Sequence, residues 1–302
     1  MSLREPSKML KTLKQYIKNK KIKNYVRSLP LQGDIASEGC LALGAVDHNN
    51  CINESSKLNY AIQNSKSLSA HFKTLGIGAA LHFNDVLLHY PQLASHIDET
   101  IVNNIKAYLG KGAMLDAVYL GVFNTRASTE NIVTNDSGLY HHDSVGNRLK
   151  LFVPINIQGN INYPTYYMNG SQNTKWKSYA NPTIGDSRLS EDILNKWVEN
   201  SISVPFSGRF IFDTNGIHRG EYVVSDMYRA ILQFEFSATK NLGFGQIGPL
   251  DFYLSSEAYN LLNNFDLLRK ENCKKTNDGY YHAGVAHRKN DTSYESIKMI
   301  EK

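Results

Sequence analysis

The chain has 302 residues, 41% of them hydrophobic, which is the composition of an ordinary globular protein long enough to bury a substantial core. Its formal net charge of +5 is modest and dispersed, so the charge gives no indication of nucleic-acid binding but is compatible with an anionic ligand. No run approaches the roughly 18 apolar residues of a membrane span, and lysines interrupt the N-terminal region throughout. We therefore expect a cytoplasmic protein without a transmembrane segment, and nothing in the sequence indicates its oligomeric state.

The first third of the chain has the spacing of helices. Residues 7–28 place apolar side chains at helical intervals among many lysines, which predicts a solvated helix with one packed face or, alternatively, a basic patch for a membrane or partner. Residues 29–55 look irregular. Two further helices are predicted near 56–75 and 91–109, and Gly110 is typical of the position just after a helix.

From about residue 115 the pattern changes to that of strands. Four segments are rich in β-branched and aromatic residues and partly alternate between polar and apolar side chains, namely 115–126, 148–158, 208–214 and 228–237. Turn-rich loops separate them, so we predict an antiparallel barrel or sandwich. Helical spacing returns at 254–270.

No linker, repeat or low-complexity segment divides the sequence. We therefore predict one domain over residues 1–302. It would consist of a helical N-terminal part (about 1–112), a β core (about 113–240) and a C-terminal helix and tail (241–302).

A histidine and a carboxylate are predicted to lie side by side at positions 141 to 143. In an extended segment, His141 and Asp143 point to one side and His142 to the other. His218, just after the strand 208–214, is the natural third ligand. Two histidines and one carboxylate on one face of a metal leave three positions open, which is typical of non-haem Fe(II) oxygenases. The H-x-D pattern by itself is common, and it equally fits a turn capped by Asp143 with exposed histidines.

Arg229 lies eleven residues after His218 within an apolar run of the strand 228–237. If the chain reverses between 222 and 227, the two strands pair and the arginine comes near the metal end. A guanidinium there can bind a carboxylate through two parallel hydrogen bonds, as a metal-chelated 2-oxo acid with a second carboxylate requires. The alternative is a surface salt bridge, but the apolar neighbours favour burial with a designated anion.

Three segments together resemble the phytanoyl-CoA dioxygenase family of Fe(II)- and 2-oxoglutarate-dependent oxygenases. They are LYHHDSVGNRLKLFVPI, NYPTYYMNGSQ and GRFIFDTNGIHRGEYVVSDMYRAILQFEFS, within residues 85–237, about half of the chain. The resemblance implies a double-stranded β-helix (jelly-roll) core, mainly β with flanking α-helices. It also implies Fe(II) held by His141, Asp143 and His218, and 2-oxoglutarate bound by Arg229. Where the family usually has a histidine after G-S, this sequence has Gln172, at a position that does not bind the metal.

Further residues are weaker candidates. In the family, polar residues of the strand before the iron motif enter the site, so Asn124 is expected to bind 2-oxoglutarate or substrate and Arg126 an anionic substrate group. Lys150, on the next strand, is expected to add positive charge. For each of the three, a position facing water is the alternative.

The resemblance implies a reaction in which O2 and 2-oxoglutarate are consumed, succinate and CO2 are released, and a C–H bond of a small, anionic or zwitterionic organic substrate is hydroxylated. Desaturation or ring formation uses the same machinery. Halogenation needs a small residue in place of Asp143, so it is disfavoured. Outside this chemistry, the sequence also fits a cupin-type metalloenzyme of a different kind, which would not need Arg229, or a non-catalytic jelly-roll binding protein.

Overall fold

The computed structural model describes most of the chain in fifteen stretches. These are residues 34–44, 48–75, 79–126, 138, 140–143, 148–155, 164–173, 189, 194–195, 201–204, 208–220, 225–237, 251–268, 273–283 and 294–301. The helix predicted over 7–28 lies outside these residues. None of the helices described in the structure is long and apolar enough to cross a membrane.

Helices frame the β core. In chain order the helical segments are α2 (Asp34–Glu38), α3 (Asn49–Asn64), α4 (Lys66–Leu75), α5 (Val86–His89), η1 (Pro91–His96), α6 (Glu99–Leu109), η3 (Ser171–Asn173), α8 (Ser256–Asn263) and η6 (Ile297–Met299). The strands are β1 (Cys40–Leu43), β2 (Ala80–Phe83), β3 (Met114–Phe123), β4 (Arg148–Pro154), β5 (Thr165–Met168), β6 (Ser201–Val204), β7 (Arg209–Asp213), β8 (His218–Gly220), β9 (Arg229–Ser237), β10 (Phe252–Leu254), β11 (Cys273–Lys275) and β12 (Tyr281–Ala283).

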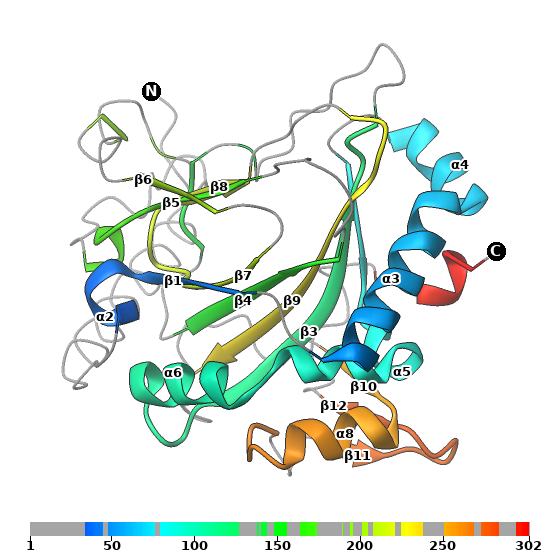
Figure 1. The fold of residues 1–302 in the computed structure, drawn as a ribbon. Helices are drawn as coiled ribbons and strands as arrows, with labels where there is room; N and C mark the ends of the chain where they lie inside the picture. The colour runs from blue at the N-terminus through cyan, green and yellow to red at the C-terminus, as the bar shows by residue number, and fades with distance from the viewer. Residues whose placement is uncertain are drawn as a thin grey trace, which may run out of the picture.

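Two antiparallel sheets form the core. The larger has six strands in the order β1-β7-β4-β9-β3-β2, and the smaller has three in the order β6-β5-β8. The smaller sheet and the helices α3 and α4 lie on opposite sides of the larger sheet (Figure 1). The predicted double-stranded β-helix with flanking helices is therefore confirmed, and its strands β3, β4, β7 and β9 are the four predicted from alternation.

Strand β9 is buried on both faces, and its sequence explains how. Alternate residues of a strand point to opposite sides. Leu232 and Phe234 join the large apolar core on the helix side, whereas Arg229, Gln233 and Glu235 point to the inner side that faces the smaller sheet. Burying a charge without partners is costly, so three polar residues on one buried face indicate that this face holds a polar site.

The predicted helices are confirmed with corrections to their bounds. The helix expected near 56–75 is two helices, α3 and α4, which separate at Ser65, and α3 begins seven residues earlier, at Asn49. The helix predicted over 91–109 is also divided: residues 91–96 form the 3-10 helix η1, and α6 begins at Glu99 and ends at Leu109 as predicted. Gly110 follows it with φ of 89°, a left-handed conformation that glycine adopts without strain. Asp98 begins the helix by accepting a hydrogen bond from the Ile101 backbone N–H, 2.9 Å.

The prediction that residues 29–55 are irregular is wrong for those of them that the structure describes. Strand β1 completes the edge of the larger sheet by pairing with β7, from Cys40 opposite Phe212 to Leu43 opposite Arg209. A strand of four residues is too short for alternation to be recognised in a sequence, and the pairing with β7 stabilises it.

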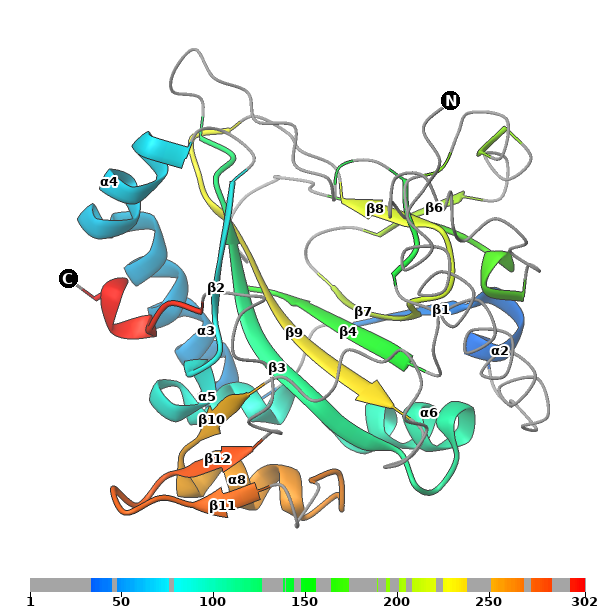
Figure 2. The same cartoon turned by 180° about the vertical axis from the view of Figure 1, so that it is seen from behind.

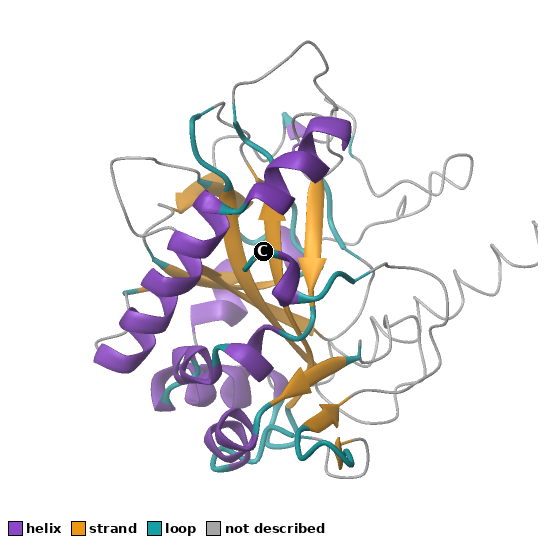
Figure 3. Cartoon of the chain, turned by 90° about the vertical axis from the view of Figure 1, so that its right-hand side faces the viewer, coloured by secondary structure: helices purple, strands orange, loops and turns teal. Residues whose placement is uncertain are grey.

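The described residues after 250 form more regular structure than the predicted C-terminal helix and tail. Helix α8 is shorter than the predicted 254–270, and β10, β12 and β11 form a small sheet that lies next to it, below the larger sheet (Figures 1 and 2). The final described segment runs beside strand β2, where the Glu295 N–H donates to the His82 carbonyl, 2.9 Å. This side of the molecule, where the C-terminus lies, faces the viewer in Figure 3.

Candidate metal centre

A backbone pair brings the two candidate histidine ligands together. The N–H of His141 donates to the carbonyl of His218 at 3.0 Å, and the N–H of His218 donates back at 2.8 Å. Residues that exchange both hydrogen bonds lie directly opposite one another in an antiparallel pair. The Asp143 N–H donates to the Thr214 carbonyl, 2.9 Å. This hydrogen bond fixes the segment 141–143 against the residue that follows β7. The sequence separation of 77 residues is thus closed by main-chain hydrogen bonds.

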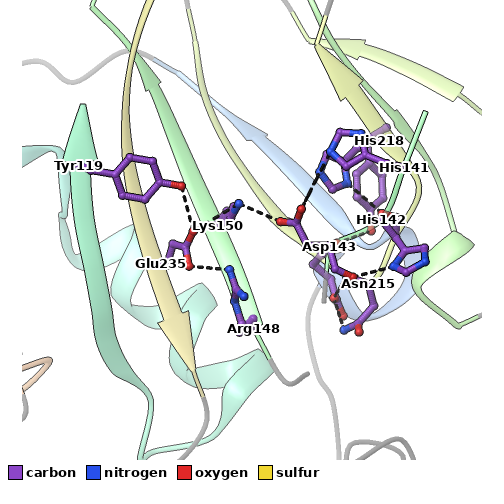
Figure 4. Close-up of polar contacts among 12 residues, drawn as sticks. Tyr119, His141, His142, Asp143, Arg148, Lys150, Asn215, His218 and Glu235 are labelled. Carbon is purple, nitrogen blue, oxygen red and sulfur yellow. Dashed lines mark hydrogen bonds and ion pairs between the residues drawn. The ribbon is translucent and has the colours of Figure 1, made fainter. Parts of the chain in front are cut away.

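His141, Asp143 and His218 each direct one donor atom at a common point (Figure 4). The three donor atoms lie within 4.8 Å of one another. Asp143 Oδ1 is 4.0 Å from His141 Nε2 and 3.9 Å from His218 Nε2. Two imidazole nitrogens and one carboxylate oxygen therefore form a group that could hold a metal ion. Among the residues that the structure describes, this is the one group of three or more such side chains that could hold a metal ion.

His218 is prepared to bind through Nε2. Its Nδ1 lies 2.9 Å from the Gly216 carbonyl oxygen, which can only accept, so Nδ1 carries the proton and Nε2 presents its lone pair. Burial, together with the nearby His141, lowers the pKa of His218 to about 3. The imidazole is therefore neutral near pH 7, as a metal ligand must be. The Phe212 ring packs on one side of it, with centroids 4.8 Å apart.

His142 points in another direction. Its Nδ1 lies 2.6 Å from the Asp143 carbonyl oxygen, and its ring lies away from the His141–His218 pair (Figure 4). The alternation expected around the H-x-D segment is present. The assignment of the three ligands stays a prediction, and the geometry supports it.

Asp143 is also held from the side opposite the histidines. Its second oxygen, Oδ2, lies 2.8 Å from Lys150 Nζ, and the same ammonium lies 3.3 Å from Glu235 Oε1. Glu235 in turn pairs with Arg148 Nη2 at 2.5 Å and accepts a hydrogen bond from the Tyr119 hydroxyl at 3.0 Å. Figure 4 shows this chain of contacts running from Tyr119 to the histidines.

Two carboxylates and two cations compensate one another in this network; Arg148 and Glu235 are buried, and Asp143 and Lys150 are partly buried. Burial by itself raises the pKa of Asp143, but Lys150, His218 and Arg148 together outweigh that effect, so the pKa lies well below its usual range. Burial acts on Lys150 in the opposite sense, and Asp143, Tyr119 and Glu235 together outweigh it, so the pKa of Lys150 is raised. Arg148 and Lys150 likewise hold the pKa of Glu235 below its usual value against the effect of burial. All four groups are therefore charged near pH 7.

Arg229 is buried on the inner face of β9 and reaches the smaller sheet. Its Nη2 lies 3.4 Å from Thr165 Oγ1, and its guanidinium carbon lies 5.7 Å from the centre of the Phe123 ring. The predicted burial is present. The alternative of a surface salt bridge is therefore wrong, while binding of 2-oxoglutarate by this residue stays a prediction.

The register of the smaller sheet relates Arg229 to the candidate ligands. His218 pairs with Tyr167, and Gly220 pairs with Thr165. The guanidinium therefore lies two residues, roughly 7 Å, further along the same sheet than His218. A Cβ atom on Gly220 would come within 2.7 Å of Arg229 Nη1, so a larger residue here would require the guanidinium to shift.

Asn124 and Arg126 lie beyond the end of β3, on a different side from Phe123. The Asn124 side-chain oxygen accepts the backbone N–H of Arg126, 3.3 Å. Arg126 donates to the Gln63 carbonyl, 2.6 Å, and its guanidinium carbon lies 3.9 Å from the centre of the Tyr228 ring. These contacts direct Arg126 toward helix α3, so they give no support to the substrate role predicted for it. A role of Asn124 toward 2-oxoglutarate stays a prediction without a contact that supports it.

Several residues of the site were not identified from the sequence. Gln233 and Glu235 stand four and six residues after Arg229 on one strand, and Arg148 stands two before Lys150 on another. Polar residues at alternate positions in otherwise apolar strands are the signal that could have identified them. Thr165 and Gly220 had no such signal, because their relation to Arg229 depends on how the two sheets face each other.

No protein-family model matches the sequence, and no curated protein matches it. Solved structures of similar shape include HygX from Streptomyces hygroscopicus, with nickel and 2-oxoglutarate bound (14% identity, TM-score 0.43, covering 68% of this chain and 85% of that one). EctD from S. alaskensis, with 2-oxoglutarate and 5-hydroxyectoine, gives 12% identity and a TM-score of 0.48 over 72% of this chain and 82% of that one.

A third structure is the epimerase SnoN in complex with Fe3+, alpha ketoglutarate and nogalamycin RO, with 10% identity and a TM-score of 0.46 over 76% of this chain and 93% of that one. At these identities and TM-scores the three similarities carry no conclusion about the chemistry of this chain. The structure itself is that of a double-stranded β-helix protein with a candidate metal centre of two histidines and one carboxylate on its inner side.

Proposed function

We propose that this protein is an Fe(II)- and 2-oxoglutarate-dependent oxygenase that hydroxylates a C–H bond of a small organic substrate. The observation that carries the proposal is the convergence of His141, Asp143 and His218, whose donor atoms lie within 4.8 Å of one another. Two histidines and one carboxylate, arranged so that three positions of an octahedral metal stay open, are the ligand set of non-haem Fe(II) oxygenases.

The donor set fits iron. The two Nε2 atoms are borderline ligands suited to Fe(II), and the carboxylate oxygen neutralises part of its charge. The Gly216 carbonyl fixes the tautomer of His218, as the outer contacts of metal-binding histidines usually do. Burial lowers the pKa of His218 and so keeps it neutral near pH 7, and burial of both histidines limits the access of water to the site.

Arg229 would bind the distal carboxylate of 2-oxoglutarate. A guanidinium can hold a carboxylate through two parallel hydrogen bonds, and the Thr165 hydroxyl beside it can donate a third. The offset of two residues between His218 and Gly220 along the smaller sheet suits a short diacid that is chelated at one end and paired with Arg229 at the other. Phe123 covers the guanidinium and would strengthen the charge pair by excluding water.

Iron, 2-oxoglutarate and O2 supply the oxidation chemistry when bound, with release of succinate and CO2. The chain's own residues position these groups and keep the site dry. Phe152 and Ile231 pack together with Phe123 on the inner face, and this apolar patch would separate the reacting centre from bulk water. Asp143 occupies the place that a small residue would need to have in a halogenating enzyme, which favours hydroxylation, or desaturation or ring formation.

We further propose that the substrate is anionic or zwitterionic, on the basis of the net charge of +5. Lys150 and Arg126 do not strengthen this part of the proposal, because the former pairs with Asp143 and Glu235 and the latter contacts Gln63.

The test is anaerobic titration of the purified protein with Fe(II) and 2-oxoglutarate, followed by measurement of succinate after O2 is admitted. Binding of Fe(II) and of 2-oxoglutarate is read directly in the titration, so this part of the assay does not depend on knowing the substrate. We expect His141→Ala, Asp143→Ala and His218→Ala each to lose Fe(II) binding and succinate formation. His142→Ala is the matched control and should keep both. Normal iron binding in all three ligand variants would overturn the proposal and favour a non-catalytic jelly roll.

A further inference from the structure

The two oxygens of Asp143 have different neighbours. Oδ1 faces the two histidines, at 4.0 Å from His141 Nε2 and 3.9 Å from His218 Nε2, whereas Oδ2 faces Lys150 Nζ at 2.8 Å. The carboxylate is thus divided between a metal side and an ammonium side, as Figure 4 shows.

Lys150 is itself held in place from behind. Its ammonium also lies 3.3 Å from Glu235 Oε1, and its side chain is 13% exposed. Glu235 cannot move easily, because Arg148 pairs with its other oxygen at 2.5 Å and the Tyr119 hydroxyl donates to Oε1 at 3.0 Å. These residues come from three adjacent strands of the larger sheet, β3, β4 and β9. The ammonium is therefore a fixed partner of Oδ2 and not a mobile surface charge.

We propose that Lys150 is a positioning residue that restricts Asp143 to binding the metal through one oxygen. The proposal rests on the proposed function, since it requires the metal to bind at this centre. A carboxylate can bind a metal through one oxygen or through both. With two histidines and a single carboxylate oxygen, an octahedral ion keeps three open positions, as a chelating 2-oxo acid and O2 together require. If both oxygens bound, only two positions would remain.

Lys150 also competes with the metal for the negative charge of Asp143. A unit positive charge within a few ångströms of a buried divalent ion opposes its binding, because the inner face of the sheet screens charges less than water does. Lys150 therefore makes metal binding weaker than the ligand set would allow, while it keeps the position that the cosubstrate uses. Loss of Lys150 should shift the two affinities in opposite directions.

The test compares wild-type protein with Lys150→Met. We expect the dissociation constant for Mn(II) or Co(II) to fall at least about tenfold, because the competing charge is gone and both oxygens can bind. The number of exchangeable waters on bound Mn(II), measured by water-proton relaxation, should fall from about three to about two. The affinity of the Fe(II)-loaded protein for 2-oxoglutarate, followed anaerobically by its absorption band, should fall at least about tenfold.

Two further variants separate positioning from a general structural role. Lys150→Arg keeps a cation beside Oδ2 and should restore the wild-type water number and both affinities. Lys275→Met removes a cation at an exposed position of β11, outside this network, so it should leave the water number and metal affinity unchanged. If Lys150→Met does not fold, Lys150→Gln takes its place, with tighter metal binding and fewer bound waters expected.

Unchanged water number and metal affinity in the neutral variant would overturn the inference. Looser metal binding there would overturn it too, because it would make Lys150 a supporting residue for affinity. Failure of the proposed function gives a different result, namely a wild-type protein that does not bind metal, or binds it just as well after His218→Ala.

Discussion

At the scale of single residues, the proposed binding of 2-oxoglutarate depends on Arg229, on the inner face of strand β9. Arg229 is buried in an apolar surrounding, and its neighbours include the Thr165 hydroxyl and the Phe123 ring. A guanidinium there can hold the distal carboxylate of a metal-chelated diacid through two parallel hydrogen bonds. The residue is therefore expected to determine cosubstrate affinity and not metal affinity.

Arg229→Ala should raise the dissociation constant for 2-oxoglutarate at least about 30-fold, because a buried charge pair of this kind is worth roughly 2–5 kcal/mol when one partner is removed. Arg229→Lys keeps the charge without the two parallel donors, so its affinity should lie in between. Binding of pyruvate, which lacks the second carboxylate, should barely change. Anaerobic titration of the Fe(II) protein with each 2-oxo acid measures this. If Arg229→Ala binds 2-oxoglutarate with wild-type affinity, another residue must bind its distal carboxylate.

Gly220→Ala tests the space that Arg229 requires. The added Cβ would come within 2.7 Å of Arg229 Nη1, so the guanidinium must move away from Thr165. We expect 2-oxoglutarate affinity to fall roughly tenfold, or about 1.4 kcal/mol, with metal affinity unchanged. Gly44→Ala is the matched control, because a Cβ there meets nothing within 4 Å. An equal loss in both variants would point to a general effect of alanine and not to the guanidinium.

At the scale of elements, the carboxylate of Asp85 holds the start of η6 in the C-terminal segment. Asp85 Oδ1 accepts the Ile297 N–H at 2.8 Å, and Oδ2 accepts the Ser296 hydroxyl at 2.7 Å. Ile297 and Ile300 are buried in the main core, so the segment contributes apolar contacts once it is held. The polar composition of the last thirty residues gave no indication of this, because two isoleucines are enough to anchor the segment.

Asp85→Ala should lower the free energy of unfolding by about 1–2 kcal/mol, because two hydrogen bonds to a charged acceptor are lost at the start of η6. The C-terminal segment should also become more accessible to proteases. Urea unfolding and limited proteolysis measure the two effects. Asp278→Ala, at an exposed position, is the control and should leave both unchanged. If the two variants are equally stable, the segment is held mainly by its isoleucines.

At the scale of the whole molecule, one apolar core joins the larger sheet to the helices and to the C-terminal segment that the structure describes. It extends from Ile35 in α2 through the strands of the larger sheet to Ile300 near the C-terminus. The single domain predicted over residues 1–302 remains a prediction. Because the core is shared, we expect unfolding in urea to be a single transition when it is followed by circular dichroism and by tryptophan fluorescence. Two separate transitions would divide the chain into domains.

Acid should weaken this core through its buried histidines. Burial, with Arg209 nearby, lowers the pKa of His96 from 6.5 to about 4, and burial lowers that of His82 to about 4 as well. The unfolded chain therefore binds these protons more readily than the folded one does. The stability from neutral His96 is fully present above pH 6.5 and is lost as pH falls toward 4. The loss amounts to about 3 kcal/mol.

His96→Gln removes this titration while it keeps a polar side chain that can bond to the Ser55 hydroxyl. Urea unfolding as a function of pH should therefore show a smaller loss for the variant between pH 6.5 and 4 than for the wild type. Above that range the two stabilities should depend on pH in the same way. Identical profiles throughout would mean that His96 is already solvated and carries none of the acid sensitivity.

The sequence by itself determined the four long core strands, helix α6 with its end at Gly110, and the four residues expected to hold metal and cosubstrate. The strands, the helix and the H-x-D segment are local features, because alternation and helical spacing depend on neighbours along the chain. His218 and Arg229 were expected from their order and spacing within the segments that carry the family resemblance, and not from a local pattern. Short strands such as β1 and β8 could not be identified, because at three or four residues their pairing partners, and not their own composition, stabilise them.

Only the tertiary structure decided which side of each strand holds the site. Asn124 and Arg126 share a face in the sequence pattern, yet Arg126, beyond the end of β3 at Phe123, turns to Gln63 and Tyr228. Lys150 was expected to add positive charge to the site, and its partners are Asp143 and Glu235, from two different segments. Contacts between segments far apart in the sequence arise from how sheets pack and register, and no local pattern records them.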